Sequence, residues 1–142
     1  MSNDTIVKTI ILDAPRLTVW AYLTEKDKLA TWFNPAENDL QPGKDYVLLA
    51  HDDSGHAKKL CWGTVELMQK PSKLVYSFTI APWMGTLTKV TWLLEDCAGG
   101  TKLTLRHEGI AAASGEKALD MLGALDVGWD EHFKDLRGEI SQ

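Results

Sequence analysis

The clearest structural signal in the sequence is TKVTWLLEDCAGGTKLTLRH, residues 88–107. In both halves, apolar residues alternate with polar or charged ones, the pattern of half-buried strands. The small residues Ala98, Gly99 and Gly100 between the halves are typical of a tight turn. A turn this short joins antiparallel neighbours, because a parallel pair needs a crossover of a dozen residues or more. The stretch therefore predicts a hairpin of strands 86–96 and 101–108.

The chain before this hairpin repeats the same pattern. Turn residues at 52–55, 71–72 and 82–85 separate apolar segments at 44–51, 57–70 and 73–81. A further alternating segment, rich in Ile and Val, covers residues 5–13 and predicts one more strand. The short connections predict an antiparallel meander.

Two segments have helical periodicity instead. Residues 16–33 carry apolar side chains at helical spacing with a break near Thr24, which predicts two short helices after Pro15. Residues 115–140 predict one long amphipathic helix, with Ser114 as its N-cap. Its apolar face, at intervals of three and four residues, consists of Ala118, Leu122, Leu125, Trp129, Phe133, Leu136 and Ile140.

The predicted order of elements is β-α-α-β-β-β-β-β-α, an α+β class with one antiparallel sheet. A helix as apolar as the last one must lie against the inner face of that sheet. The length of 142 residues fits one domain, residues 1–142.

The alternation of the strands predicts which side chains point toward the helix. Charged residues such as Lys102 and Arg106 must face outward, so their immediate neighbours face inward. The predicted inner face consists of Tyr46, Leu48, Ala50, Cys61, Gly63, Val65, Leu67, Leu74, Tyr76, Phe78, Ile80, Val90, Trp92, Leu94, Leu103, Leu105 and His107.

Large aromatic side chains are concentrated where this face meets the last helix, and six of the twelve aromatic residues are Trp. Two interpretations stay open: a tightly packed core, or an apolar pocket between sheet and helix that takes a small ligand. On the second interpretation the candidate ligand-binding residues are Trp32, Phe33, Tyr46, Tyr76, Phe78, Trp83, Trp92, Leu105, His107, Leu125 and Trp129.

Groups that carry chemistry are sparse. His107 is the one titratable side chain placed firmly inward, and no carboxylate at matched spacing is there to orient it as a base. We expect His107 and Tyr46 to act at most as polar anchors for a ligand. The cluster His51, Asp52, Asp53 and His56 is a hairpin tip and lacks a further metal ligand. The sequence therefore predicts no catalytic residue, metal or cofactor, and a non-enzymatic role is favoured.

Composition and charge exclude other classes. A net charge of −5 argues against nucleic-acid binding. No apolar run reaches the ~18 residues of a membrane span, and the first residues lack a secretion signal. Cys61 and Cys97 fall on strands separated by another strand, so we expect free thiols and a cytoplasmic location. The last segment, 115–142, holds seven acids and three bases, net −4, and forms either a solvated face or a docking surface for a basic protein partner. The oligomeric state stays open.

Several motifs also resemble a known family. Ala14-Pro15 followed by Val19-Trp20 is similar to the strand-to-helix signature of the START-like, helix-grip superfamily. More narrowly, the chain resembles the family of the activator of the heat-shock-protein-90 ATPase in its bacterial single-domain form. Further matching stretches are 32–33, 63–67, 71–74, 88–94, 100–109 and 128–129, while Lys44 stands where the family often has Gly.

The resemblance implies a sheet that curls around the C-terminal helix and leaves a cavity between them. Lipid carriers, hormone receptors and cyclases share this fold, so the implied function is binding of a small hydrophobic or amphipathic molecule. A co-chaperone or stress-linked interaction module is the alternative that the family name implies. An enzyme of cyclase or hydrolase type is a third, and it needs a second polar group beside His107.

Overall fold

The computed structural model describes residues 5–51 and 53–141. Strand β1 (Ile6–Leu12) is followed by helices α1 (Arg16–Thr24) and α2 (Lys26–Trp32). Five strands come next: β2 (Asp45–His51), β3 (Ala57–Gln69), β4 (Lys73–Ile80), β5 (Thr88–Cys97) and β6 (Gly100–Glu108), with the 3-10 turn η1 (Ala81–Trp83) before β5. The C-terminal segment contains α3 (Ile110–Ser114), the 3-10 turn η2 (Gly115–Lys117) and α4 (Ala118–Ile140).

The strands form one antiparallel sheet in the order β1-β6-β5-β4-β3-β2. The predicted β5–β6 hairpin is present, and its register places Glu95 opposite Lys102 and Cys97 opposite Gly100. Ala98 and Gly99 in its turn both have positive φ, as a two-residue turn that follows the twist of the strands requires. The predicted α+β class and meander are confirmed.

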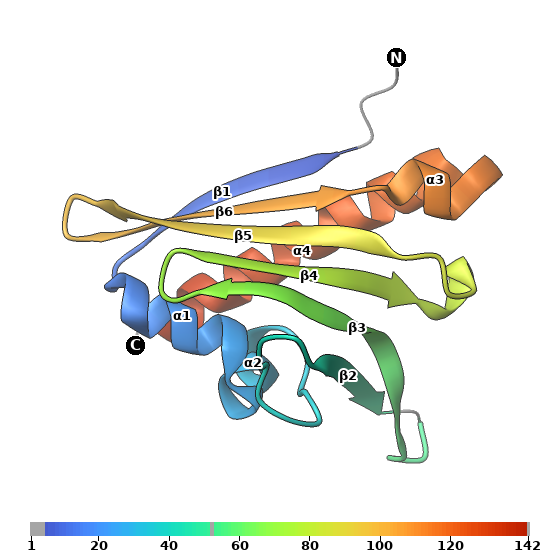
Figure 1. The fold of residues 1–142 in the computed structure, drawn as a ribbon, viewed down its shortest axis with the longest axis horizontal. Coiled ribbons are helices and arrows are strands. Elements are labelled where there is room, and N and C mark those ends of the chain that lie inside the picture. The colour runs from blue at the N-terminus through green and yellow to red at the C-terminus, as the bar shows by residue number, and fades with distance from the viewer. Residues whose placement is uncertain (1–4, 52, 142) are drawn as a thin grey trace.

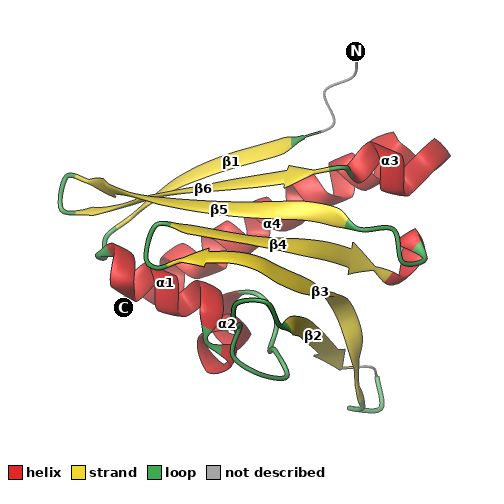
Figure 2. Ribbon diagram, viewed as in Figure 1, coloured by secondary structure: helices red, strands yellow, loops and turns green. Residues whose placement is uncertain are grey.

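The sheet curves around α4, which crosses its inner face, while α1 and α2 cover one end of that face (Figure 1). Figure 2 shows the resulting two layers, strands on one side and helices on the other. Buried side chains from both layers form one hydrophobic cluster that includes Trp92, Leu105 and Leu136. The space between sheet and helix is therefore filled over much of its length.

The start of the last helix differs from the prediction. A separate short helix, α3, precedes α4, and α4 begins at Ala118 rather than at 115. Ser114 caps neither helix. Its hydroxyl instead accepts a hydrogen bond from Nε1 of Trp83 at 3.0 Å. The hydroxyl that was predicted to cap the helix therefore forms a tertiary contact.

Two bulges in β3 change the inner face. Cys61 pairs with Leu48 and Lys59 with Leu49, so Leu60 is an extra residue in the ladder. Glu66 is a second one, between the pairs Val65–Tyr76 and Leu67–Val75.

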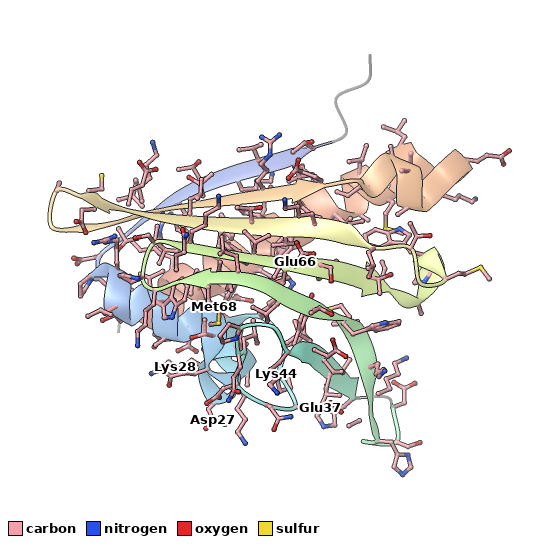
Figure 3. All side chains as sticks on the ribbon, viewed as in Figure 1. Asp27, Lys28, Glu37, Lys44, Glu66 and Met68 are labelled. Atoms are coloured by element: carbon pink, nitrogen blue, oxygen red, sulfur yellow. The ribbon has the colours of Figure 1, made fainter. Side chains whose placement is uncertain are left out.

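An extra residue reverses which side the following side chains face. The inward placement of Leu67 was therefore wrong, and Met68 packs against the core instead (Figure 3).

Candidate functional site

A pocket of about 220 Å³ opens between the inner face of the sheet and α4. We name it the helix–sheet pocket. It is lined by Phe33, Asn34, Leu60, Cys61, Phe78, Ile80, Leu125, Gly128, Trp129 and His132. These residues come from the end of α2, from β3 and β4, and from the middle of α4, so four separate parts of the sequence build one site.

Three rings form an aromatic wall of the pocket. The ring centroid of Phe33 lies 4.7 Å from that of His132 and 5.3 Å from that of Trp129, and the latter two are 5.8 Å apart. The rings are tilted toward one another rather than stacked, an arrangement that aromatic groups favour. The wall is therefore a flat-sided, largely apolar surface, in which the Trp129 indole N–H is already bonded to His107 and the His132 ring has a nitrogen left for a further hydrogen bond.

The pocket is open because the residues that α4 contributes to it fill little of the space. Gly128 has no side chain, and a Cβ added to it would meet no atom within 4 Å. Leu125, one turn earlier, is only half-buried. The first eleven residues of α4, 118–128, include no buried side chain, whereas Trp129, Phe133 and Leu136 are buried. The helix therefore closes the interior in its second half and leaves it open in its first.

The bulge at Leu60 shapes the opposite wall. In a regular strand, consecutive side chains point to opposite faces, but Leu60 and Cys61 both line the pocket. Burial raises the pKa of the Cys61 thiol to about 12, so the group is a neutral apolar surface at physiological pH.

His132 supplies the titratable polar group of the pocket. Its Nδ1 lies 3.2 Å from the carbonyl oxygen of Trp32. Because a carbonyl only accepts, Nδ1 carries the proton and the neutral ring has its lone pair on Nε2. Among the described residues no group bonds Nε2, and no buried nitrogen or oxygen is left without a partner, so Nε2 is accessible. Burial lowers the pKa of His132, which favours the neutral ring.

His107, the predicted polar anchor, is fully engaged inside the core. Nε1 of Trp129 donates to its Nδ1 at 3.3 Å, and its Nε2 donates to Oγ1 of Thr88 at 2.8 Å. The Thr88 hydroxyl in turn donates to the carbonyl of Phe78 at 2.8 Å. Burial lowers the pKa of His107 to about 4 and keeps the ring neutral. A ligand would have to displace one of these groups to reach either nitrogen.

The other predicted ligand-binding residues divide into two groups. Phe33, Phe78, Leu125 and Trp129 line the pocket. Packed around it in the core are Trp32, Tyr46, Tyr76, Trp83, Trp92 and Leu105.

Their polar atoms are paired within the protein. The Tyr46 hydroxyl donates to the carbonyl of Ser77 at 2.6 Å, and Nε1 of Trp92 donates to the Tyr76 hydroxyl at 2.9 Å. Nε1 of Trp32 donates to the carbonyl of Tyr22. These residues form part of the packed core against which the pocket-lining side chains rest.

Six lining residues were not among the predicted ligand-binding residues: Cys61 and Ile80, which were predicted only to face inward, and His132, Asn34, Gly128 and Leu60, which were missed altogether. His132 could have been found, since Leu125, Gly128, Trp129 and His132 follow the i, i+3, i+4, i+7 spacing of one helical face. Leu60 could not, because nothing in the local pattern marks the bulge.

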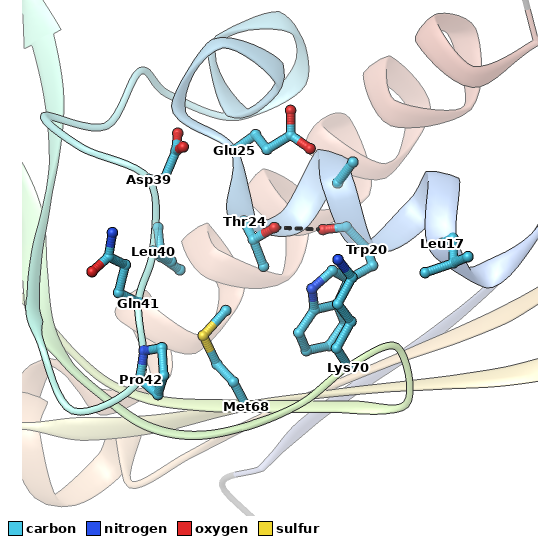
Figure 4. Close-up of a pocket in the computed structure, with 11 residues that line it drawn as sticks. Leu17, Trp20, Thr24, Glu25, Asp39, Leu40, Gln41, Pro42, Met68 and Lys70 are labelled. Atoms are coloured by element: carbon cyan, nitrogen blue, oxygen red, sulfur yellow. Dashed lines mark hydrogen bonds between the residues drawn. The ribbon is translucent and has the colours of Figure 1, made fainter.

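A larger hollow of about 580 Å³ lies on the surface beside α1 (Figure 4). Trp20, Leu40 and Met68 contribute apolar surface to it, but Glu25, Asp39 and Lys70 contribute charges of both signs. Such a mixed and solvated lining gains little from burying an apolar ligand, so this hollow is a weaker candidate than the helix–sheet pocket.

The remaining predictions concern the charge of α4, the cysteines, metal binding and membrane spans. Lys8 of β1 forms salt bridges with Asp126 and Asp130 of the acidic helix α4. Part of the negative charge of α4 is thereby matched within the chain.

Both cysteines are free, as expected. In the described part of the chain no three His, Cys, Asp or Glu side chains gather as metal ligands, and no helix is long and apolar enough to cross a membrane. Asp52 of the hairpin tip and residues 1–4 lie outside the described residues.

A curved antiparallel sheet around a long C-terminal helix defines a START-like, helix-grip domain. Residues 13–140 match the family model described as "Activator of Hsp90 ATPase homolog 1-like protein". The chain belongs to this family. No curated protein matches the chain.

Solved structures share the fold. CV1439 from Chromobacterium violaceum is 20% identical, with 98% of each chain covered and a TM-score of 0.80. CalU16 from Micromonospora echinospora is 24% identical, covering 96% of this chain and 76% of CalU16, with a TM-score of 0.76. PFC0360w, an HSP90 activator from Plasmodium falciparum, is 23% identical over 73% of this chain and 71% of its own, with a TM-score of 0.60.

Proposed function

We propose that the protein binds a small hydrophobic or amphipathic molecule in the helix–sheet pocket. The observation that carries the proposal is the apolar opening of about 220 Å³ at Gly128, in a core whose described polar groups are otherwise paired. Burying the ligand's apolar surface against Phe33, Phe78 and Trp129 would contribute ~25 cal/mol per Å². The pocket contains one thiol, Cys61, and one imidazole, His132, but among the described residues no hydrogen bond joins them, and burial raises the pKa of the thiol to about 12, so the geometry supports binding rather than turnover.

The test fills the pocket without disturbing the fold. Gly128→Leu places a side chain in open space on the pocket face of α4. Gly123→Leu is the matched control: the same substitution on the same helix, at an exposed position that does not line the pocket.

A panel of small apolar compounds, followed by two-dimensional NMR, should bind wild type and Gly123→Leu and fail to bind Gly128→Leu. Extraction of the denatured wild-type protein for mass spectrometry should release a small molecule that the Gly128→Leu variant lacks. Equal binding to all three proteins would refute the proposal.

A second candidate is an interaction module of the Hsp90-activator type. It is supported by the family model and by the likeness to the Plasmodium falciparum activator. The acidic face of α4 would be the surface for a basic partner, although Lys8 already pairs with two of its carboxylates. A pull-down with the host chaperone tests it, using Glu131→Lys combined with Asp135→Lys as the variant that should lose binding. Absence of chaperone in the pull-down, together with an unchanged ATPase rate, disposes of this candidate.

A further inference from the structure

We propose that the ligand of the helix–sheet pocket is a neutral single-ring molecule, such as a phenol, that donates a hydrogen bond to Nε2 of His132. This inference rests on the proposed function, because it names the chemical class of molecule that the same pocket takes. Three properties of the pocket carry it: its size, its lack of charge and its one exposed acceptor nitrogen.

The size of the pocket limits the ligand to one ring. An apolar cavity of about 150 Å³ holds benzene, so about 220 Å³ accommodates a ring with a small substituent. A long acyl chain or a fused ring system would have to extend either out into solvent, where its apolar surface stays hydrated, or deeper between sheet and helix. That space is occupied by Trp92, Leu105 and His107, which are at most 1% exposed.

The lining of the pocket selects against an ionised ligand. Among the described residues that line it, none is Lys, Arg, Asp or Glu. A carboxylate bound there would lose its hydration without gaining a counter-charge, which is costly for any buried ion. A neutral hydroxyl or N–H group meets no such penalty.

Two polar side chains line the pocket, Asn34 and His132, and His132 is the one that belongs to the aromatic wall and so orients a planar ligand. His132 donates from Nδ1 to the Trp32 carbonyl, so its Nε2 presents a lone pair. The aromatic wall of Phe33, Trp129 and His132 provides flat surfaces for a planar ring. A ring lying against Phe33 and Trp129 with its hydroxyl toward Nε2 satisfies both requirements at once. A ring that lacks a donor leaves that nitrogen without a partner.

The experiment compares phenol, anisole, benzoate and 1-octanol by NMR titration of the full chain. Anisole has the ring of phenol and no donor, benzoate adds a charge, and 1-octanol replaces the ring by a long chain. We expect phenol to bind about 3- to 10-fold more tightly than anisole, the range of a net hydrogen bond. Benzoate and 1-octanol should bind more weakly than phenol.

His132→Asn separates the two roles of the side chain. The amide NH₂ of Asn replaces the Nδ1 donor to Trp32, while the acceptor at the Nε2 position is lost. The variant should bind phenol and anisole with equal affinity, and both less tightly than wild type binds phenol, because one ring of the aromatic wall is also lost. His132→Phe, checked by its melting temperature, should give the same loss of preference. Gly128→Leu should abolish binding of both ring probes.

The outcomes separate this inference from the function on which it rests. The inference alone would be overturned by equal affinity of wild type for phenol and anisole, or by a preference for phenol over anisole that survives in both His132 variants. Tighter binding of benzoate or 1-octanol than of phenol would overturn it too. In each case Gly128→Leu must still remove binding, so that the proposed function stands. Failure of every probe to bind wild type, or indifference of binding to Gly128→Leu, would overturn the proposed function as well.

Discussion

The two halves of α4 pack against the same sheet in opposite ways. In the second half, Leu136 is fully buried, and Phe133 packs against Trp92 with ring centroids 6.0 Å apart. In the first half no side chain is buried, and Leu125 and Gly128 border an open pocket. The second half thus provides stability, while the first half leaves room for a ligand. The difference teaches that one amphipathic helix can supply both, depending on where its large and small residues fall.

The largest expected effect comes from truncating the same residue type in both halves. Leu136→Ala should lower the free energy of unfolding by about 3–5 kcal/mol, because it leaves a cavity in a closed core. Leu125→Ala should cost about 1 kcal/mol, since Leu125 is half-buried beside space that already exists. Urea denaturation measures both. Equal losses would show that the two halves do not differ in packing.

The second expected effect concerns acid and the boundary between the halves, where Trp129 contacts His107. Burial lowers the pKa of His107 to about 4, against an ordinary value of about 6.5. Between pH 6.5 and 4 the unfolded chain binds a proton that the folded chain does not, so stability is complete above pH 6.5 and falls as the pH drops toward 4. The loss approaches about 3 kcal/mol.

Urea midpoints at pH 7.5 and pH 4.5 measure this loss, with His107→Gln as the control. Other groups titrate in both proteins, so the difference between the two curves isolates His107. Parallel pH dependence in wild type and variant would contradict the assignment of a buried, neutral ring.

The smallest expected effect tests the openness of the first half. Gly128→Ala should raise the free energy of unfolding by about 1 kcal/mol, because Ala is the better helix former and its methyl group meets no neighbour within 4 Å. Gly63→Ala, in the closed part of the sheet, should destabilise the protein instead, since a Cβ there would clash with the backbone carbonyl of Ser77. Thermal melts compare the two. A destabilised Gly128→Ala variant would mean that the pocket wall is closed.

The sequence was sufficient to predict the β5–β6 hairpin and the inward side chains of β5 and β6. From Lys102 to Arg106 in β6 polar and apolar residues alternate at every position, so these two charges define its faces, and β5 has Val90, Trp92 and Leu94 at every second position. The apolar face of α4 was predicted for the same reason, because its spacing is that of a regular helix. Regular elements carry their orientation in their periodicity.

The pocket itself was only partly predictable. Its opening depends on the bulge at Leu60, which breaks the alternation in β3, and on how far Trp129 and Phe78 fill the space between sheet and helix. Both are results of tertiary packing and leave no periodic signal. His107 illustrates the point, since its inward orientation was predicted correctly, while Trp129 and Thr88 occupy both of its nitrogens.

The bulge at Leu60 also determines how the protein can be labelled. Cys61 lies in the wall of the pocket, and with a pKa of about 12 its thiolate amounts to about one part in 10⁵ at pH 7. Maleimides, which react with thiolates, should therefore attach first at the half-buried Cys97, next to the β5–β6 turn. A dye placed there leaves the pocket untouched, and the slow modification of Cys61 reports how often local fluctuations expose its buried thiol to solvent.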